Sequence, residues 1–135
     1  MKKIITLIVL ATFIMVGATS CKKYEEGPAI SLRSKTSRVA GDWKLDKATQ
    51  DGVDITSTIQ IDYITFEKDG AYKFVGGGLE VVGTWSFDDK KEHIITKEDG
   101  SADQQKFKII KLKNKELWFD QEVATQIIRY QWVPK

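Results

Sequence analysis

Residues 79–88 read LEVVGTWSFD, and the alternation in this stretch decides the fold class. Successive side chains of a β-strand point to opposite faces of a sheet, so alternating apolar and polar residues indicate a strand with one buried face. Gly83 falls on the apolar face, where it leaves room for a neighbouring chain or marks a bend. The other residues of that face are Leu79, Val81, Trp85 and Phe87.

The same alternation extends from Val39 to Val133 and is broken by Asp-Gly pairs and other turn residues, most of them about 8 to 15 residues apart. This spacing is typical of a β-barrel or a β-sandwich. Long segments with a helical period are missing, and residues 54–58 are compatible with a short helix or a loop. We expect strands near residues 39–48, 60–68, 71–76, 79–88, 93–98, 104–113, 116–121 and 125–133.

Eight strands joined mostly by tight turns predict an all-β domain, an eight-stranded antiparallel up-and-down barrel whose closure removes exposed strand edges. The three glycines at 76–78 are followed by a strand rather than a helix, so we interpret them as a hairpin turn and not as a phosphate-binding loop. In the segment 104–113 the apolar residues change parity after Ile109, which predicts a β-bulge.

The N-terminus has the layout of a secretory signal, with Lys2 and Lys3 before an apolar run at 4–17. The run is shorter than the roughly 20 apolar residues that span a bilayer, so cleavage is the better interpretation. The residues Ala-Thr-Ser-Cys at 18–21 resemble the lipobox of bacterial lipoproteins, with Ala18 where that family usually has Leu. The resemblance implies lipidation of Cys21 and an anchor in a membrane of the bacterial cell envelope, expected to be the outer membrane.

These features divide the chain into a signal peptide at 1–20, a lipidated cysteine with a flexible tether at 21–37, and a barrel domain at 38–135. Without the signal peptide the chain has 19 basic and 19 acidic residues. A neutral domain has no electrostatic basis for binding nucleic acid. Cys21 is the only cysteine, so the domain holds no disulfide of its own and must be stabilised by its core. We assume a monomer.

The sequence offers no pattern for catalysis or for a metal centre. His93 is the only histidine, whereas a zinc site needs three or four ligands, usually His or Cys. We therefore expect His93 to be a solvated strand residue, and we expect neither an enzyme nor a cofactor. Five lysines spaced along residues 106–115 are expected to form a charged solvent face rather than an anion site.

Four motifs in order resemble the lipocalin-like domain of bacterial lipoproteins, and the resemblance covers Val39 to Val133. They are Gly41-Asp42-Trp43, Thr65-Phe66-Glu67-Lys68-Asp69-Gly70, Gly83-Thr84-Trp85 and Glu116-Leu117-Trp118-Phe119. The resemblance implies a cup-shaped barrel whose first Trp packs at the closed end under an Arg from late in the chain. Trp43 and Arg129 are the pair that it suggests.

The aromatic residues are the feature with the clearest functional potential, because an eight-stranded barrel either holds one small ligand or is filled by its own side chains. A hollow barrel would bind a small apolar or amphipathic ligand, with Tyr72 and Tyr130 as polar groups. A solid barrel would instead be an envelope-structural or protein-interaction module that uses loops such as 50–58 and 99–103. The candidate lining residues are Trp43, Phe66, Tyr72, Phe74, Trp85, Phe87, Phe107, Phe119, Tyr130 and Trp132.

Overall fold

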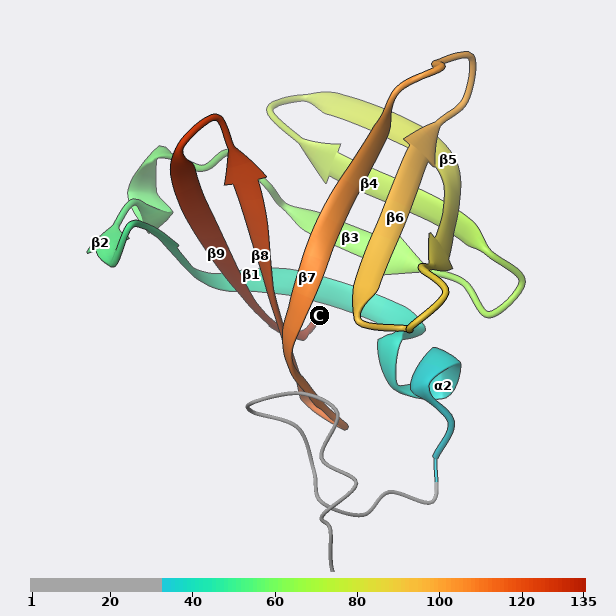
Figure 1. Ribbon diagram of the computed structural model, residues 1–135. Helices are drawn as coiled ribbons and strands as arrows, with labels where there is room; N and C mark the ends of the chain where they lie inside the picture. The colour runs from blue at the N-terminus through green and yellow to red at the C-terminus, as the bar shows by residue number, and fades with distance from the viewer. Residues whose placement is uncertain (1–32) are drawn as a thin grey trace, which may run out of the picture.

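Nine strands make up most of residues 33–135, which is the part of the chain that the computed structural model describes (Figure 1). The signal peptide, Cys21 and most of the expected tether lie outside the described residues. The elements are α2 (Lys35–Val39), β1 (Gly41–Gln50), β2 (Val53–Asp54), the 3-10 helix η1 (Thr56–Thr58), β3 (Tyr63–Phe66), β4 (Ala71–Gly76), β5 (Leu79–Phe87), β6 (His93–Glu98), β7 (Gln104–Lys113), β8 (Glu116–Val123) and β9 (Gln126–Pro134).

The sheet closes into a barrel because its first long strand pairs with its last. From β3 to β9 each strand pairs with the next in antiparallel register, β3 pairs with β1, and β1 pairs with β9 from Trp43–Pro134 to Gln50–Ile128. Eight strands therefore form the ring, and the two-residue strand β2 adds to β1 outside it. This confirms the predicted eight-stranded antiparallel up-and-down barrel.

A short helix stands where the sequence predicted the end of the tether and the start of the first strand. Ser34 caps α2, since its side chain accepts a hydrogen bond from the backbone N–H of Ser37 at 3.1 Å. Val39, expected in the first strand, ends this helix and is fully buried. A five-residue helix has too few turns to show a helical period in the sequence, so the pattern of apolar residues does not indicate it.

Two tryptophan side chains tie neighbouring turns to the barrel. The Trp43 indole Nε1 donates to the Val39 carbonyl at 2.8 Å, which fixes the end of α2 against β1. The Trp85 Nε1 donates to the Glu67 carbonyl at 2.8 Å, which holds the β3–β4 turn against β5. Both Gly-x-Trp motifs therefore act as structural clamps in which the ring is buried and its N–H satisfies a turn carbonyl.

The suggested pairing of Trp43 with Arg129 is wrong. Arg129 instead binds Asp120 with two hydrogen bonds of 2.7 and 2.9 Å. The physical reason is strand alternation, which puts Arg129 on the face opposite to its neighbour Tyr130. Arg38 of α2 is the arginine that packs at this end of the barrel, where its Nη1 donates to the Leu112 carbonyl at 3.0 Å.

Two local irregularities follow the sequence pattern. The register of β7 against β8 shifts between Ile109 and Lys111, which confirms the predicted bulge. A Cβ atom on Gly83 would collide with the Lys97 carbonyl oxygen, so the glycine allows β6 to approach β5 closely. Leu79, expected on the buried face, is 69% exposed because it lies in the β4–β5 hairpin beyond the end of the β5–β6 pairing.

Candidate functional site

The interior of the barrel is filled on the side of α2 and hollow beyond it. The filled part holds fully or nearly fully buried side chains that include Val39, Trp43, Ile94, Leu112 and Leu117. The hollow part is a cavity of about 130 Å³. Its lining residues are Ile61, Ile64, Phe66, Tyr72, Phe74, Thr96, Phe107, Phe119, Gln121, Tyr130 and Trp132.

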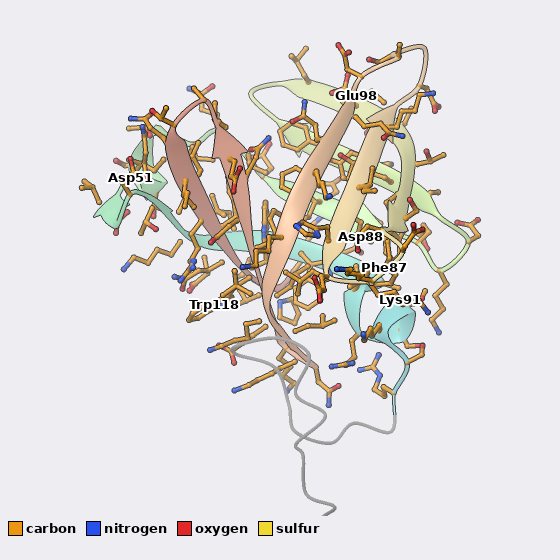
Figure 2. The ribbon with its side chains drawn as sticks, in the orientation of Figure 1. Asp51, Phe87, Asp88, Lys91, Glu98 and Trp118 are labelled. Atoms are coloured by element: carbon orange, nitrogen blue, oxygen red, sulfur yellow. The ribbon has the colours of Figure 1, made fainter. Side chains whose placement is uncertain are left out.

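Seven of the ten aromatic residues singled out from the sequence line this cavity, and three do not. Trp43 and Trp85 belong to the packed core instead. Phe87 packs edge-on against Trp85 with ring centroids 5.3 Å apart. Figure 2 shows Phe87 at the end of the barrel that carries α2, whereas Glu98 marks the opposite end.

Phe119 is the centre of the aromatic wall. Its ring lies 4.8 Å from that of Phe107, 5.7 Å from that of Tyr130 and 5.7 Å from that of Trp132, measured between centroids. The angles between these ring planes run from 37° to 51°, so the rings are tilted against one another rather than stacked. Tilted aromatic pairs at these distances stabilise the wall by about 0.5–1.5 kcal/mol each beyond the area that they bury.

Besides the Trp132 indole, whose buried Nε1 has no hydrogen-bond partner among residues 33–135, the polar groups of the cavity come from four side chains. Burial, with a smaller effect of the Glu98 charge, raises the pKa of Tyr72 to about 12, and burial also raises the pKa of Tyr130. Tyrosine is already neutral at physiological pH with its ordinary pKa of about 10, and the raised pKa values leave both phenols their hydrogen-bond donors. The Tyr130 hydroxyl donates to Oε1 of Gln121 at 3.3 Å. Thr96, the fourth, is 4% exposed.

Thr96 and Gln121 were not singled out from the sequence, although alternation places both on the inner face. Thr96 follows Ile94 by two positions, and Gln121 follows Phe119 by two. A polar residue at an inward position of an otherwise apolar strand is the signal that identifies them.

A second hollow, of about 440 Å³, lies on the outside of the barrel over β6, β7 and β8. All of its lining residues have polar or charged side chains, in contrast to the interior cavity. Gln121 belongs to both hollows, so the two adjoin. The outer hollow is lined by His93, Gln104, Gln105, Lys106, Lys108, Asp120, Gln121 and Glu122.

His93 is half-buried rather than freely solvated, because it is paired with Asp88 at the start of β6. Its Nδ1 lies 2.8 Å from the Asp88 Oδ2, while Oδ1 accepts from the backbone N–H groups of Glu92 and His93. Desolvation acts to raise the pKa of Asp88, but these hydrogen bonds and the His93 charge lower it to about 2. The Asp88–His93 pair therefore stabilises the turn between β5 and β6.

Over residues 33–135 no group of three or more His, Cys, Asp or Glu side chains is arranged to hold a metal ion. The helices in this same range are all too short or too polar to cross a bilayer.

The comparisons with known proteins agree with the barrel. A crystal structure of a DUF4847 family protein from Bacteroides vulgatus is similar in fold, with a TM-score of 0.51 and 12% sequence identity, and the match covers 73% of this chain and 94% of that one. No curated protein matches the sequence. The lipocalin-like domain family matches residues 39–119, which is more than half of the chain and includes both Gly-x-Trp motifs. The chain therefore belongs to the family of lipocalin-like domains.

Proposed function

We propose that this protein binds the apolar part of a small ligand inside its barrel, without catalysing a reaction. The observation that carries the proposal is the interior cavity with its aromatic wall, which the protein's own side chains leave unfilled. Concave sites lined by apolar and aromatic groups, with few polar ones, are the usual form of small-molecule sites. Affinity would come from removing apolar ligand surface from water, about 0.8 kcal/mol for each buried methylene.

The cavity volume restricts the ligand. At about 130 Å³, it is close to the engineered cavity of about 150 Å³ that takes up benzene. It is smaller than the roughly 300–1,000 Å³ of sites that enclose a drug-sized molecule. We therefore expect a single ring or a short alkyl chain to enter the barrel, and any larger part of the ligand to remain outside.

Tyr72 and Tyr130 are the groups that we propose to orient the ligand. Each lines the cavity, and each phenol is protonated at neutral pH, since burial raises a pKa that for tyrosine is already about 10. Tyr130 already donates to Gln121, so its oxygen is available as an acceptor. Hydrogen bonds of this kind give orientation, while the rings supply the apolar contact.

We propose that binding takes place at a membrane of the bacterial envelope, expected to be the outer membrane, where lipidated Cys21 would anchor the chain. The support is the sequence at 1–21, which lies outside the described residues. A lipobox lipoprotein carries more than one acyl chain, and two chains are enough for stable anchoring. Cys21→Ser should move the protein from the membrane fraction to the soluble fraction, and continued membrane association of this variant would contradict the anchor.

One observation favours the alternative of a protein-interaction module. Val53, Val123 and Ile127 are 68%, 44% and 46% exposed at the tips of two hairpins. The two hairpins touch, since the backbone N–H of Asp51 donates to the Ile127 carbonyl at 2.9 Å. Exposed apolar side chains gathered in this way are a common feature of contact surfaces.

Binding of a short-chain alcohol separates the two functions. We would record ¹H–¹⁵N NMR spectra of the full-length chain during titration with hexanol, and examine the purified protein by native mass spectrometry for a retained ligand. Ligand binding predicts saturable shifts at cavity residues such as Phe74, Phe107 and Phe119, and none at the Val53 hairpin. A titration without saturable shifts, together with a ligand-free mass, would contradict the ligand-binding function.

A further inference from the structure

Strands β7 and β8 separate partway along the barrel. They pair from Lys113–Glu116 to Lys108–Asp120, and there the pairing ends. Beyond this point residues 104–107 of β7 pair only with β6, and residues 121–123 of β8 pair only with β9. Figure 1 shows the two strands diverging toward the end of the barrel opposite α2. The barrel wall therefore has a lateral break between two neighbouring strands.

The outer hollow lies over this break. All of its lining residues except His93 come from β7 and β8, at or beyond the last position of their backbone pairing, where Lys108 lies opposite Asp120. Gln121 lines the outer hollow and the interior cavity alike. A molecule placed in the break would therefore contact the aromatic interior on one side and the polar outer hollow on the other.

Two glutamines bridge the break where backbone pairing is lost. Gln105 and Gln121 lie at inward positions of their strands, and the Gln121 Nε2 donates to the Gln105 Oε1 at 2.8 Å. The Tyr130 hydroxyl donates to Oε1 of the same Gln121 side chain. A neutral hydrogen bond between side chains contributes only about 0.5–1.5 kcal/mol net, and both amides line the outer hollow. They can therefore exchange this bond for bonds to water or to a ligand head group at little cost when an apolar chain passes between them.

The charges around the break favour an anion. The Asp120 carboxylate is occupied by both hydrogen bonds from Arg129, and His93 is paired with Asp88. Among the remaining charged residues of the hollow, Lys106 and Lys108 form no ion pair within residues 33–135, and neither does Glu122. Two ammonium groups against one carboxylate leave the hollow with an excess of positive charge.

We infer that the break between β7 and β8 is a head-group site, and that the ligand is a small amphiphile with an anionic head such as a carboxylate, sulfate or phosphate. The apolar part enters the cavity between Gln105 and Gln121, and the head stays in the outer hollow near Lys106 and Lys108. This inference rests on the proposed ligand-binding function and adds the ligand's charge and its position. The sequence predicted that these two lysines form part of a charged solvent face, whereas the inference assigns them to an anion site.

Three six-carbon probes of different charge test the inference, namely hexanoate, hexanol and hexylamine. Their affinities for the full-length chain are measured by NMR titration at low salt. Hexanoate should bind about fivefold more tightly than hexanol, because each of two exposed charge pairs adds a modest attraction. Hexylamine should bind least well. The advantage of hexanoate should shrink as salt is raised, since exposed charges are screened.

The variant Lys106→Gln/Lys108→Gln should abolish the preference for hexanoate while leaving the affinity for hexanol unchanged. Lys113→Gln is the matched control, because Lys113 is an exposed residue of the same strand outside the hollow. Both changes replace exposed lysines, so the fold should be retained, and circular dichroism checks this. The side-chain amide signals of Gln105 and Gln121 should shift when hexanoate binds.

The possible outcomes distinguish this inference from the function on which it rests. Equal binding of the three probes, or a preference for hexanoate that survives in the double variant, overturns the head-group site and leaves ligand binding in the barrel intact. Failure of all three probes to bind overturns the proposed function and the head-group site together. If the preference for hexanoate is lost in the double variant but kept in Lys113→Gln, the head-group site and the proposed function are both supported.

Discussion

Replacing Phe119 by Leu should weaken the fold and improve binding in the barrel at the same time. Phe119 is 3% exposed, lines the cavity and makes three ring contacts, with Phe107, Tyr130 and Trp132. Aromatic pairs contribute about 0.5–1.5 kcal/mol each beyond the area that they bury, so losing three removes roughly 1.5–4.5 kcal/mol. Leu retains much of the buried apolar area, and we expect a net loss of about 2 kcal/mol.

The same substitution enlarges the cavity, because Leu is smaller than Phe and rigid neighbours close a void only in part. A larger cavity should bind hexanol more tightly, since more of the chain can leave water. Urea unfolding gives the stability, and NMR titration gives the affinity.

Phe87→Leu is the control. Phe87 also packs against an aromatic ring, that of Trp85, but it does not line the cavity. This control should lose about 1 kcal/mol of stability through its single ring pair and leave hexanol affinity unchanged. If Phe119→Leu and Phe87→Leu changed hexanol affinity equally, the assignment of the cavity as the binding site would be refuted.

Three further substitutions test the framework of the barrel. Gly83→Ala should cost about 1–3 kcal/mol in urea unfolding, because its methyl group would collide with the β6 backbone; the exposed Thr84→Ala on the same strand should change stability much less, and an equal loss would contradict the close approach of β6. Trp85→Phe should cost about 1 kcal/mol because it removes one of the two hydrogen bonds to the Glu67 carbonyl and leaves the 3.1 Å bond from the Gly70 N–H, and unchanged amide exchange in the β3–β4 turn would argue against the clamp. Asp88→Ala should cost about 1 kcal/mol at pH 7, where Asp88 is ionised in a partly buried turn. Because the pKa of Asp88 is lowered from 3.8 to about 2 in the fold, its contribution is complete above about pH 4 and is lost as pH falls through 2; a difference between wild type and variant that persisted below pH 2 would rule out this cause.

The sequence predicted the faces of the strands well and their partners less well. Alternation identifies which side chains of a strand point inward, because the period of two is a property of one strand. It therefore placed the seven cavity-lining aromatics on inner faces. Alternation also predicted that Arg129 points outward, and in the structure Arg129 binds Asp120 on the outer face. The suggested pairing with Trp43 came from family resemblance, and the arginine that packs at that end comes from α2.

The number of residues over which two neighbouring strands pair was not predictable from the sequence, because it depends on the positions of both strands. Residues 104–113 and residues 116–123, each taken alone, do not predict that the pairing of β7 with β8 ends at Lys108 and Asp120. Barrel strands lie tilted against one another, so neighbouring strands need not overlap along their whole length. The lateral break is thus a consequence of the three-dimensional arrangement and not of local propensity.

The break between β7 and β8 is nevertheless marked in the sequence by two exceptions to the alternation of apolar and polar residues. Gln105 precedes Phe107 by two positions and Gln121 follows Phe119 by two, so both amides stand where alternation calls for apolar side chains. A polar side chain on an inner face is costly unless it finds a partner or water. These two find each other across the break, at a place that the outer hollow opens to solvent. An inward polar residue near the end of each of two neighbouring strands is therefore a sign that the wall between them is open, and in this barrel that opening lies beside the cavity.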